Sequence, residues 1–342
     1  MKNAIITGGS GYFGECLINY LNKKDIKTYS LDINQPANKK NITEFLHLNV
    51  LDLKDNLSFL KDKDVLFHCV ANVPLAKNKK LFYKNNVEGT IAVLDACLKT
   101  GIKKVVILSS SAVYGIPNSN PVDENTLPKP MEEYGKAKLE SEKICFREKY
   151  KSIDISIIRP RTILGHGRLG IFEILFDWIK QGYNIPVLNG GNNIYQFIHA
   201  DDLANACFLS TNTKGINIFN CGTDNYSSIK DVLEYLCTHA KTGSKVKSLP
   251  MWIIEPLMKI SSTLNISPLA PYHSLMYGRS LYFDNKKIKR LGWKSMYSNN
   301  QMFIESYEYY LKNYEYMIND SILSDHKKKV KRKILNVIKY II

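Results

Sequence analysis

Short apolar runs alternate with amphipathic segments along the first 160 residues of the chain. The apolar runs indicate β-strands over residues 3–7, 27–33, 45–50, 65–71, 104–110 and 155–160. The segments between them have helical periodicity at residues 14–24, 81–101 and 132–150. Strands that alternate with helices and are apolar almost throughout are typical of a parallel sheet covered on both faces. We therefore predict an α/β fold with a doubly wound parallel sheet, in which ligands bind at the carboxyl ends of the strands.

The pattern is less regular after about residue 160. Residues 170–182 and 231–241 have helical periodicity, and residues 195–210 are typical of a short strand that runs into a helix. We expect a sheet domain over residues 1–160, to which residues 194–222 can return, a smaller lobe over residues 161–315, and a separate tail over residues 316–342.

Nearly half of the net charge of +15 lies in the C-terminal tail, where seven basic residues and no acidic residue lie between His326 and Ile342. The remaining excess is dispersed, which favours ordinary surface lysines over a nucleic-acid partner. In residues 326–342 apolar side chains recur at helical spacing opposite the lysines. This pattern predicts a basic amphipathic helix in peripheral contact with an anionic membrane surface. The alternative is a terminal helix that packs on the protein itself.

The seven cysteines are spread along the chain and form no CxxC pair and no cluster with histidine at metal-ligand spacing. They indicate reduced thiols in a cytoplasmic protein, and we expect no metal site. The N-terminus begins directly with a folded-domain pattern, and no apolar run reaches about 18 residues. We therefore expect a chain that is neither secreted nor membrane-spanning.

The sequence TGGSGYFG at residues 7–14 directly follows the first predicted strand and leads into a predicted helix. Glycines here allow a tight turn, let a pyrophosphate approach the backbone and bring the helix close to the strand. The free N–H groups of the helix N-terminus then face the anion. The motif predicts a dinucleotide-binding loop that comprises Gly8, Gly11, Tyr12, Phe13 and Gly14.

Two aspartates follow neighbouring predicted strands. Asp32 ends the second strand, where a carboxylate accepts hydrogen bonds from a ribose 2′-hydroxyl and repels a 2′-phosphate. It predicts NAD rather than NADP as the cofactor, the alternative being a residue that only begins a turn. Asp52 is predicted to end the third strand and to meet the adenine amino group, the alternative being a helix cap.

Tyr134 and Lys138 lie four residues apart in a predicted helix, so their side chains share one face. An ammonium beside a phenol lowers the phenol pKa from about 10 towards working pH. Such a tyrosine can exchange a proton with a substrate hydroxyl while hydride moves to or from nicotinamide. Serines at residues 109–111 end a predicted parallel strand, where a second hydrogen-bonding group for the substrate oxygen is expected.

With these features together, the chain resembles the extended short-chain dehydrogenase/reductases, the NAD-dependent epimerase/dehydratase group. The resemblance covers roughly residues 2–315. The motifs that carry it are TGGSGYFG, LDLKD, FHCVAN, NNVEGT, SSSAVYG, YGKAK and YFDNKKIKRLGW. It implies a modified Rossmann fold that binds NAD, a smaller C-terminal substrate lobe and a homodimer.

The resemblance also implies roles by position. Tyr134 becomes the general acid/base, Lys138 its activator and a ribose ligand, and Ser110 the substrate-binding serine, with Ser111 as the fallback. Val70 and Ala71 line the nicotinamide side of the cofactor.

The strand end RPRTILGHGR provides the remaining candidates. It has Arg161 and Thr162 where sugar epimerases often have an asparagine for the diphosphate, and Arg168 offers a further phosphate-binding charge. In the next lobe, Asp202 is expected to order the junction between lobes, while His166 and His199 receive no role.

Ser111-Ala112 stands where nucleotide-sugar dehydratases have an Asp-Glu pair, which disfavours water elimination. We expect an NAD-dependent enzyme that acts on a secondary alcohol or ketone, with nucleotide-sugar epimerase as its specific form. The apolar segment 249–272 also resembles the 3β-hydroxysteroid dehydrogenase branch, which makes a lipophilic alcohol the alternative substrate. A non-catalytic NAD-sensing protein is the third interpretation.

Overall fold

The computed structural model describes residues 1–71, 83–170, 172–250, 252 and 278–315. The predicted tail over residues 316–342 and all but a few residues of the apolar segment 249–272 lie outside the described residues.

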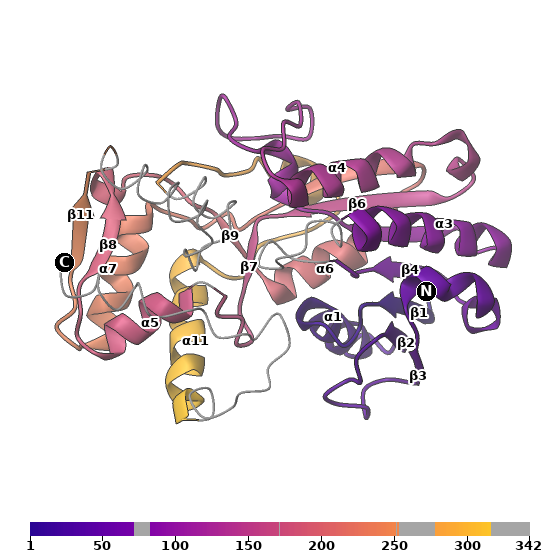
Figure 1. Cartoon of the computed structure of the whole chain (residues 1–342), viewed down its shortest axis with the longest axis horizontal. Helices are drawn as coiled ribbons and strands as arrows, with labels where there is room; N and C mark the ends of the chain where they lie inside the picture. The colour runs from indigo at the N-terminus through magenta and orange to yellow at the C-terminus, as the bar shows by residue number, and fades with distance from the viewer. Residues whose placement is uncertain (72–82, 171, 251, 253–277, 316–342) are drawn as a thin grey trace.

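A seven-stranded sheet with the order β10-β6-β5-β4-β1-β2-β3 forms the larger part of the molecule (Figure 1). All of its neighbouring strands pair in parallel. The strands are β1 (Asn3–Thr7), β2 (Lys27–Asp32), β3 (Glu44–His47), β4 (Val65–His68), β5 (Lys104–Leu108), β6 (Asp154–Pro160) and β10 (Ile216–Cys221). The predicted parallel α/β sheet is confirmed, and residues 216–221 form its outermost strand beside β6.

Helices cover both faces of the sheet, as the strand pattern predicts. The helices α3 (Gly89–Thr100) and α4 (Glu133–Cys145) pack on one face, in the same core cluster as Ile5. The helices α1 (Tyr12–Asn22) and α6 (Ala200–Ser210) pack on the other, in the same cluster as Ile6. Successive strand residues point to opposite faces, so a strand that is buried on both sides is apolar at every position.

The chain reverses its direction of travel across the sheet after β3. It runs outward from β1 to β2 and β3, and then returns to place β4 on the opposite side of β1. Such a reversal leaves a crevice at the carboxyl ends of the two diverging strands, where α/β proteins bind ligands. The site is therefore expected where β1 and β4 end.

A smaller lobe packs beside this sheet around aromatic side chains that include Phe176, Phe197 and Phe303. It contains the parallel pair β8 (Ile185–Leu188) and β11 (Val246–Leu249) and the helices α5 (Phe172–Lys180), α7 (Ile229–Ala240) and α11 (Asn299–Lys312). A second pair, β7 (Thr162–Leu164) and β9 (Phe197–His199), lies at the junction with the main sheet.

Asp202 orders that junction, as the sequence predicts. Its carboxylate accepts hydrogen bonds from the backbone N–H groups of Met296 and Tyr297. The backbone carbonyl of Asp202 accepts a hydrogen bond from the indole N–H of Trp293 at 2.8 Å. The segment between the main sheet and α11 is thereby anchored to the start of α6.

Two predicted elements differ in the structure. The third strand, predicted over residues 45–50, ends at His47, and a 3₁₀ helix, η1 (Val50–Asp55), follows it. The Asn49 side chain accepts a hydrogen bond from Leu51 N–H at 3.1 Å, a local bond that competes with strand pairing. The helix predicted over residues 81–101 begins, within the described part, with a π turn, η3 (Lys84–Glu88), before α3.

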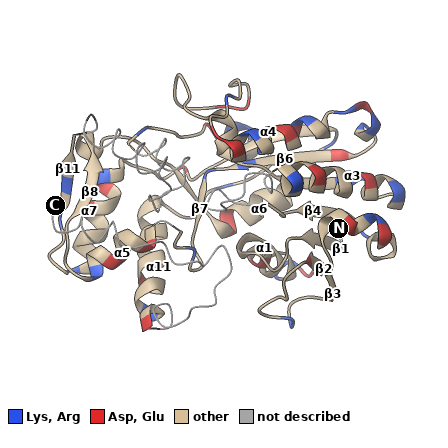
Figure 2. Cartoon of the chain, viewed as in Figure 1, with Lys and Arg blue, Asp and Glu red and all other residues tan. Residues whose placement is uncertain are grey.

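Charges of both signs are interspersed along the exposed faces of α3 and α4 (Figure 2). On α4 they form i,i+3 pairs, Lys136 with Glu133 and Lys143 with Glu140. Among the residues that the structure describes, no helix is long and apolar enough to cross a membrane.

A buried ion pair fixes α4 against the main sheet. Glu142 on α4 pairs with Arg159 on β6, with Oε2 to Nη2 at 2.5 Å and Oε1 to Nε at 3.0 Å, and each side chain is 3% exposed. Arg159 also donates to the Tyr114 hydroxyl at 2.7 Å, and the Ser109 hydroxyl donates to Glu142. The partners come from α4, from β6 and from the segment after β5, so one carboxylate sets the relative position of all three.

We expect Glu142→Gln to lower the free energy of unfolding by about 3–5 kcal/mol, because Arg159 then keeps a buried charge without a counter-charge. Glu140→Gln, on the exposed side of the same helix, is the matched control and should cost less than about 1 kcal/mol. Urea denaturation measures both. Equal losses in the two variants would show that the buried pair does not hold the helix.

Candidate active site

The glycine-rich loop connects β1 to α1 in a conformation that only glycine adopts easily. Gly8 has φ of 76°, and its N–H donates to the carbonyl of Leu31 at 2.8 Å. A Cβ on Gly14 would lie 2.1 Å from the carbonyl oxygen of Gly8, so a side chain there would push the helix away from the loop. Gly11 precedes α1 without a side-chain cap, which leaves N–H groups of the first turn available to an anion.

Asp32 ends β2 beside this loop, at the position that the sequence predicts. It is 8% exposed, and its carboxylate accepts hydrogen bonds from the N–H groups of Ser10 at 3.1 Å and Asn34 at 2.9 Å. A carboxylate has about four acceptor positions, so others remain for a ligand. Asp52 does not end a strand as predicted. It lies exposed in the first turn of η1, because β3 stops at His47.

The other predicted cofactor residues occupy different surroundings. Tyr12 directs its hydroxyl away from the loop and donates to the carbonyls of Leu164, the last residue of β7, and Gly165. Phe13 is buried in the core between the sheet and α1. Val70 and Ala71 follow β4, and the Val70 backbone lies so close to Gly8 that a Cβ on Gly8 would be 2.9 Å from the Val70 nitrogen. The ends of β1 and β4 therefore meet in van der Waals contact.

Ser110, Tyr134 and Lys138 come together at the end of β5. Glu132 accepts hydrogen bonds from the N–H groups of Tyr134 and Gly135 and so fixes the start of α4. The Ser110 hydroxyl caps η4 (Ser111–Tyr114) by accepting from Ala112 N–H at 3.1 Å, and it also hydrogen-bonds with Tyr134.

Lys138 is buried one turn after Tyr134 on α4, and its ammonium donates to the carbonyl of Leu108 at 2.7 Å. This carbonyl belongs to the last residue of β5. The lysine thereby links α4 to the strand end that carries Ser110.

The pKa of Tyr134 does not shift as the sequence predicts. Burial raises it from 10.0 to about 12, and the hydrogen bond from Ser110 and the charge of Arg168 lower it only in part. Burial also lowers the pKa of Lys138 from 10.5 to about 8. The lysine ammonium is directed to a backbone carbonyl, and within the described structure the charge that lowers the pKa of Tyr134 is that of Arg168.

The predicted substrate residues lie on the segment after β6 and at the end of β5. Arg161 is 1% exposed and donates from Nη1 to the hydroxyl of Ser111 at 2.9 Å. Its guanidinium carbon lies 4.6 Å from the centre of the Tyr195 ring. Arg168 lies farther along the chain, with its guanidinium 5.0 Å from the ring centre of Tyr12. Arg161 therefore lies beside Ser111, whereas Arg168 lies beside the ring of Tyr12 and close enough to Tyr134 for its charge to lower the pKa of that tyrosine.

Asn86 was not singled out from the sequence. It is 1% exposed in the π turn η3, and neither polar atom of its side-chain amide has a partner within the described structure. The backbone carbonyl of Asn86, in contrast, accepts hydrogen bonds from the hydroxyls of Thr90 and Ser141. π turns occur frequently at functional sites. The NNVEGT motif contains this asparagine, but only the fold shows that its amide is buried and unpaired.

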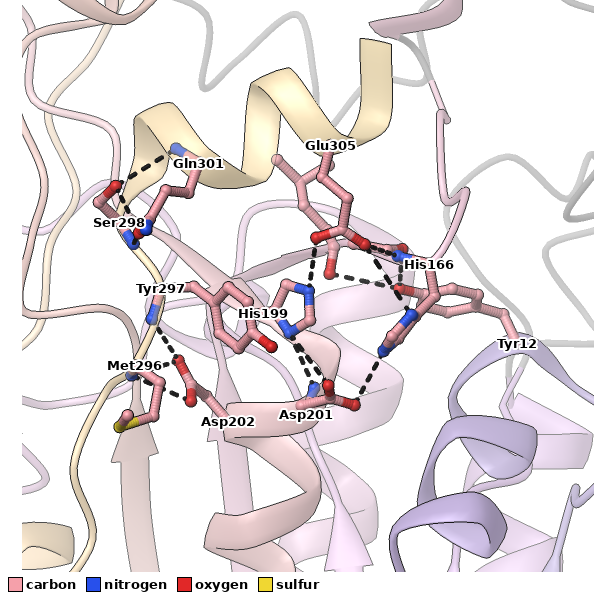
Figure 3. Close-up of polar contacts among 12 residues, drawn as sticks. Tyr12, His166, His199, Asp201, Asp202, Met296, Tyr297, Ser298, Gln301 and Glu305 are labelled. Carbon is pink, nitrogen blue, oxygen red and sulfur yellow. Dashed lines mark hydrogen bonds and ion pairs between the residues drawn. The ribbon is translucent and has the colours of Figure 1, made fainter. Parts of the chain in front are cut away.

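A network of histidines and carboxylates holds the loop after β7 (Figure 3). The ring of His166 donates to the Asp201 carboxylate at 2.8 Å, and the backbone N–H of His166 donates to the Glu305 carboxylate at 2.8 Å. His199 accepts from Asp201 N–H through Nδ1, so its Nε2 carries the proton that it donates to Glu305 at 3.0 Å. The hydrogen bond to Asp201 raises the pKa of His166.

This network connects α6, α11 and the loop that Tyr12 contacts. Ligand atoms of His166, His199 and Asp201 lie within 4.8 Å of one another, a separation that a metal ion can bridge. Both ring nitrogens of His199 are already engaged in hydrogen bonds, however, and a neutral imidazole offers a metal only its unprotonated nitrogen. The geometry therefore favours a hydrogen-bonded brace between the two lobes.

Comparison with known proteins places this site in a family. The pattern described as the NAD dependent epimerase/dehydratase family matches residues 4–222. The chain is 46% identical to the uncharacterized protein y4nG of Sinorhizobium fredii, over 99% of this chain and 86% of that one. It is 28% identical to a putative UDP-glucose 4-epimerase of Methanocaldococcus jannaschii, over 85% and 92% of the two chains. It is 24% identical to the mouse decarboxylating sterol-4-alpha-carboxylate 3-dehydrogenase, over 85% of each.

Solved structures share the fold at lower identity. UDP-glucose 4-epimerase from Thermotoga maritima, in a structure with UDP-glucose, has a TM-score of 0.73 at 20% identity and covers 91% of this chain and 99% of its own. MoeE5, in complex with UDP-glucuronic acid and NAD, has a TM-score of 0.71 at 19% identity with the same coverage. The family pattern, the long relative and the parallel sheet agree, and the chain belongs to the NAD dependent epimerase/dehydratase family, the extended short-chain dehydrogenase/reductases.

Proposed function

We propose that this protein is an NAD-dependent epimerase of nucleotide sugars, which inverts a carbinol carbon through a transient ketone. The observation that carries the proposal is the hydrogen-bonded pair of Ser110 and Tyr134 beside the buried ammonium of Lys138. The pair lies at the carboxyl end of β5, next to the strand β4 whose end touches the glycine loop. A proton-exchanging hydroxyl is thereby combined with a dinucleotide-binding loop.

The residues present fit NAD. The loop at Gly8 and Gly14 has no room for side chains, and the uncapped N-terminus of α1 suits a pyrophosphate. Asp32 would hold a ribose hydroxyl and disfavour a 2′-phosphate. Lys138 and the unpaired amide of Asn86 would hold the nicotinamide half. When bound, NAD supplies the acceptor and later the donor of hydride.

Residues of the chain itself donate and accept the proton that the reaction requires. Ser110 holds the substrate oxygen, while Tyr134 exchanges its proton with that oxygen. At a pKa of about 12 the tyrosine rests as a phenol, which suits donation to a ketone oxygen. That donation leaves a phenolate, whose charge Arg168 helps to stabilise, and the opposite step, removal of the carbinol proton, uses the phenolate as base and restores the phenol. The absence of an Asp-Glu pair after Ser110 leaves no further acid and base there for water elimination.

Nucleotide sugars are supported by the UDP-glucose epimerases among the relatives and by the structures that bind UDP-sugars. The alternative, a dehydrogenase of a lipophilic alcohol, is favoured by the similarity to the sterol-4-alpha-carboxylate 3-dehydrogenases. An epimerase returns the hydride to its substrate, so sugar isomerisation without NADH release distinguishes it from a dehydrogenase. The homodimer and the membrane contact through residues 326–342 stay predictions of the sequence.

Tyr134→Phe should reduce kcat by about 100-fold or more, because the variant cannot exchange a proton. Its affinity for NAD should stay within about threefold of the wild type, since the ring and its packing are kept. Turnover of UDP-glucose, followed by sugar chromatography, and NAD titration provide the two measurements. Full turnover in this variant would rule out the assigned acid/base.

Asp32→Ala should weaken NAD binding about tenfold and reduce the preference for NAD over NADP, because a hydrogen-bonding and repelling carboxylate is lost. Asp55→Ala removes an exposed carboxylate from η1 and is the matched control. Titration of each variant with both dinucleotides checks the expectation. An unchanged ratio of the two affinities would assign Asp32 to the turn alone.

Lys138 should make stability depend on pH. Its pKa of about 8 in the folded chain lies below the ordinary 10.5, so between these values the unfolded chain binds the proton and the folded chain does not. Stability then rises with pH, relative to Lys138→Met, by up to about 1.4 kcal/mol per pH unit. Below the pKa of about 8 that Lys138 has in the folded chain, the difference in stability between the wild type and Lys138→Met should not change with pH. Urea denaturation of nucleotide-free protein tests this, with exposed Lys136→Met as the control that should show no such slope.

A further inference from the structure

Arg161 carries a buried charge that the described residues do not compensate. It is 1% exposed, and no carboxylate in the described part of the chain forms an ion pair with it. A guanidinium stays protonated in proteins, so its charge cannot be discharged by losing a proton. Isolated buried charges are costly, and the rings of Tyr195 and Phe283, at 4.6 and 5.7 Å from its guanidinium carbon, offset only a part.

The free hydrogen-bonding positions of Arg161 lie on one edge. Nη1 donates to Ser111, whereas Nε and Nη2 have no partner among the described residues. The N–H bonds of Nε and Nη2 lie in the guanidinium plane and point in parallel from the same edge of the group. This edge matches the two oxygens of a carboxylate or phosphate. Arg159, two residues earlier, shows the matching: its Nε and Nη2 bind the two oxygens of Glu142.

The position of this edge limits what it can bind. Ser111, which orients Arg161, is the next residue after Ser110, and consecutive Cα atoms are about 3.8 Å apart. Ser110 is the residue that pairs with Tyr134. The guanidinium of Arg161 is thus anchored next to the residue that pairs with Tyr134, which favours an anion near the reacting carbon over one at the nucleotide end of the substrate.

We propose that Arg161 is a specificity-determining residue that binds a carboxylate of the substrate close to the carbinol carbon, which makes the preferred substrate a sugar acid linked to a nucleotide. The proposal rests on the proposed nucleotide-sugar function. Ser111 is the positioning residue that orients Arg161, and the aromatic rings exclude water from the ion pair.

The test measures binding to the NAD-loaded full-length chain by calorimetry. The ligands are UDP, UDP-glucose and UDP-glucuronic acid, which differ by the sugar and then by the carboxylate. The wild type should bind the glucuronic acid about 10- to 100-fold more tightly than the glucose compound. Arg161→Met should lose this preference and bind UDP as the wild type does. Exposed Lys136→Gln removes one positive charge from α4 and should keep the preference.

Arg161→Lys keeps the charge without the bidentate edge and should retain only a part of the preference, and it serves as the second variant if Arg161→Met fails to fold. If the arginine variants lost affinity for UDP as much as for UDP-glucuronic acid, the free edge of Arg161 would bind the diphosphate, and the proposal would be overturned. A preference that is absent in the wild type, or unchanged in the variants, would make Arg161 purely structural.

If the wild type binds none of the three ligands, the proposed nucleotide-sugar function fails separately. The carboxylate inference is then decided with a 3β-hydroxysteroid, with and without a carboxylate on the neighbouring carbon. A preference for the acid that disappears in Arg161→Met upholds the role of the arginine, and no preference overturns it.

Discussion

The buried ion pair between Glu142 and Arg159 is the interaction on which the geometry of the site depends. It joins α4 to β6, and through Ser109 it also fixes the end of β5. Lys138 lies one turn before Glu142, and Tyr134 one turn before Lys138. A shift of α4 along the sheet would therefore move the tyrosine away from Ser110. Because the pair is almost completely excluded from water, breaking one partner costs much more than breaking a surface pair.

The same burial that fixes these residues also shifts their protonation. Desolvation keeps Tyr134 as a phenol and weakens the hold of Lys138 on its proton. The cation that lowers the pKa of Tyr134 belongs to Arg168, on a loop that the His166 network braces against α6 and α11. The electrostatic environment of Tyr134 thereby includes a residue on a loop that the smaller lobe holds in place.

Two arginines after β6 illustrate how similar residues acquire different functions. Arg159 and Arg161 are both buried and lie on the same side of the extended chain, two residues apart. Arg159 reaches Glu142 and is compensated within the protein, whereas Arg161 reaches Ser111 and has no partner on its bidentate edge among the described residues. The first stabilises the fold, and the second is the arginine that we propose for the substrate.

The sequence by itself determined the parallel sheet, its covering helices, the glycine loop with Asp32, and the placement of Tyr134 and Lys138 one turn apart on the same helix. These features follow from local periodicity, from turn chemistry and from helical spacing, which neighbouring residues specify. The boundary of β3 was misplaced because a side-chain turn at Asn49 competed with the strand. The tertiary structure alone decided that the charge of Arg168 lowers the pKa of Tyr134 and that, among the described residues, the Asn86 amide has no partner and Arg161 has no counter-charge. Each of these depends on solvent exclusion and on contacts between distant segments, which a linear pattern does not encode.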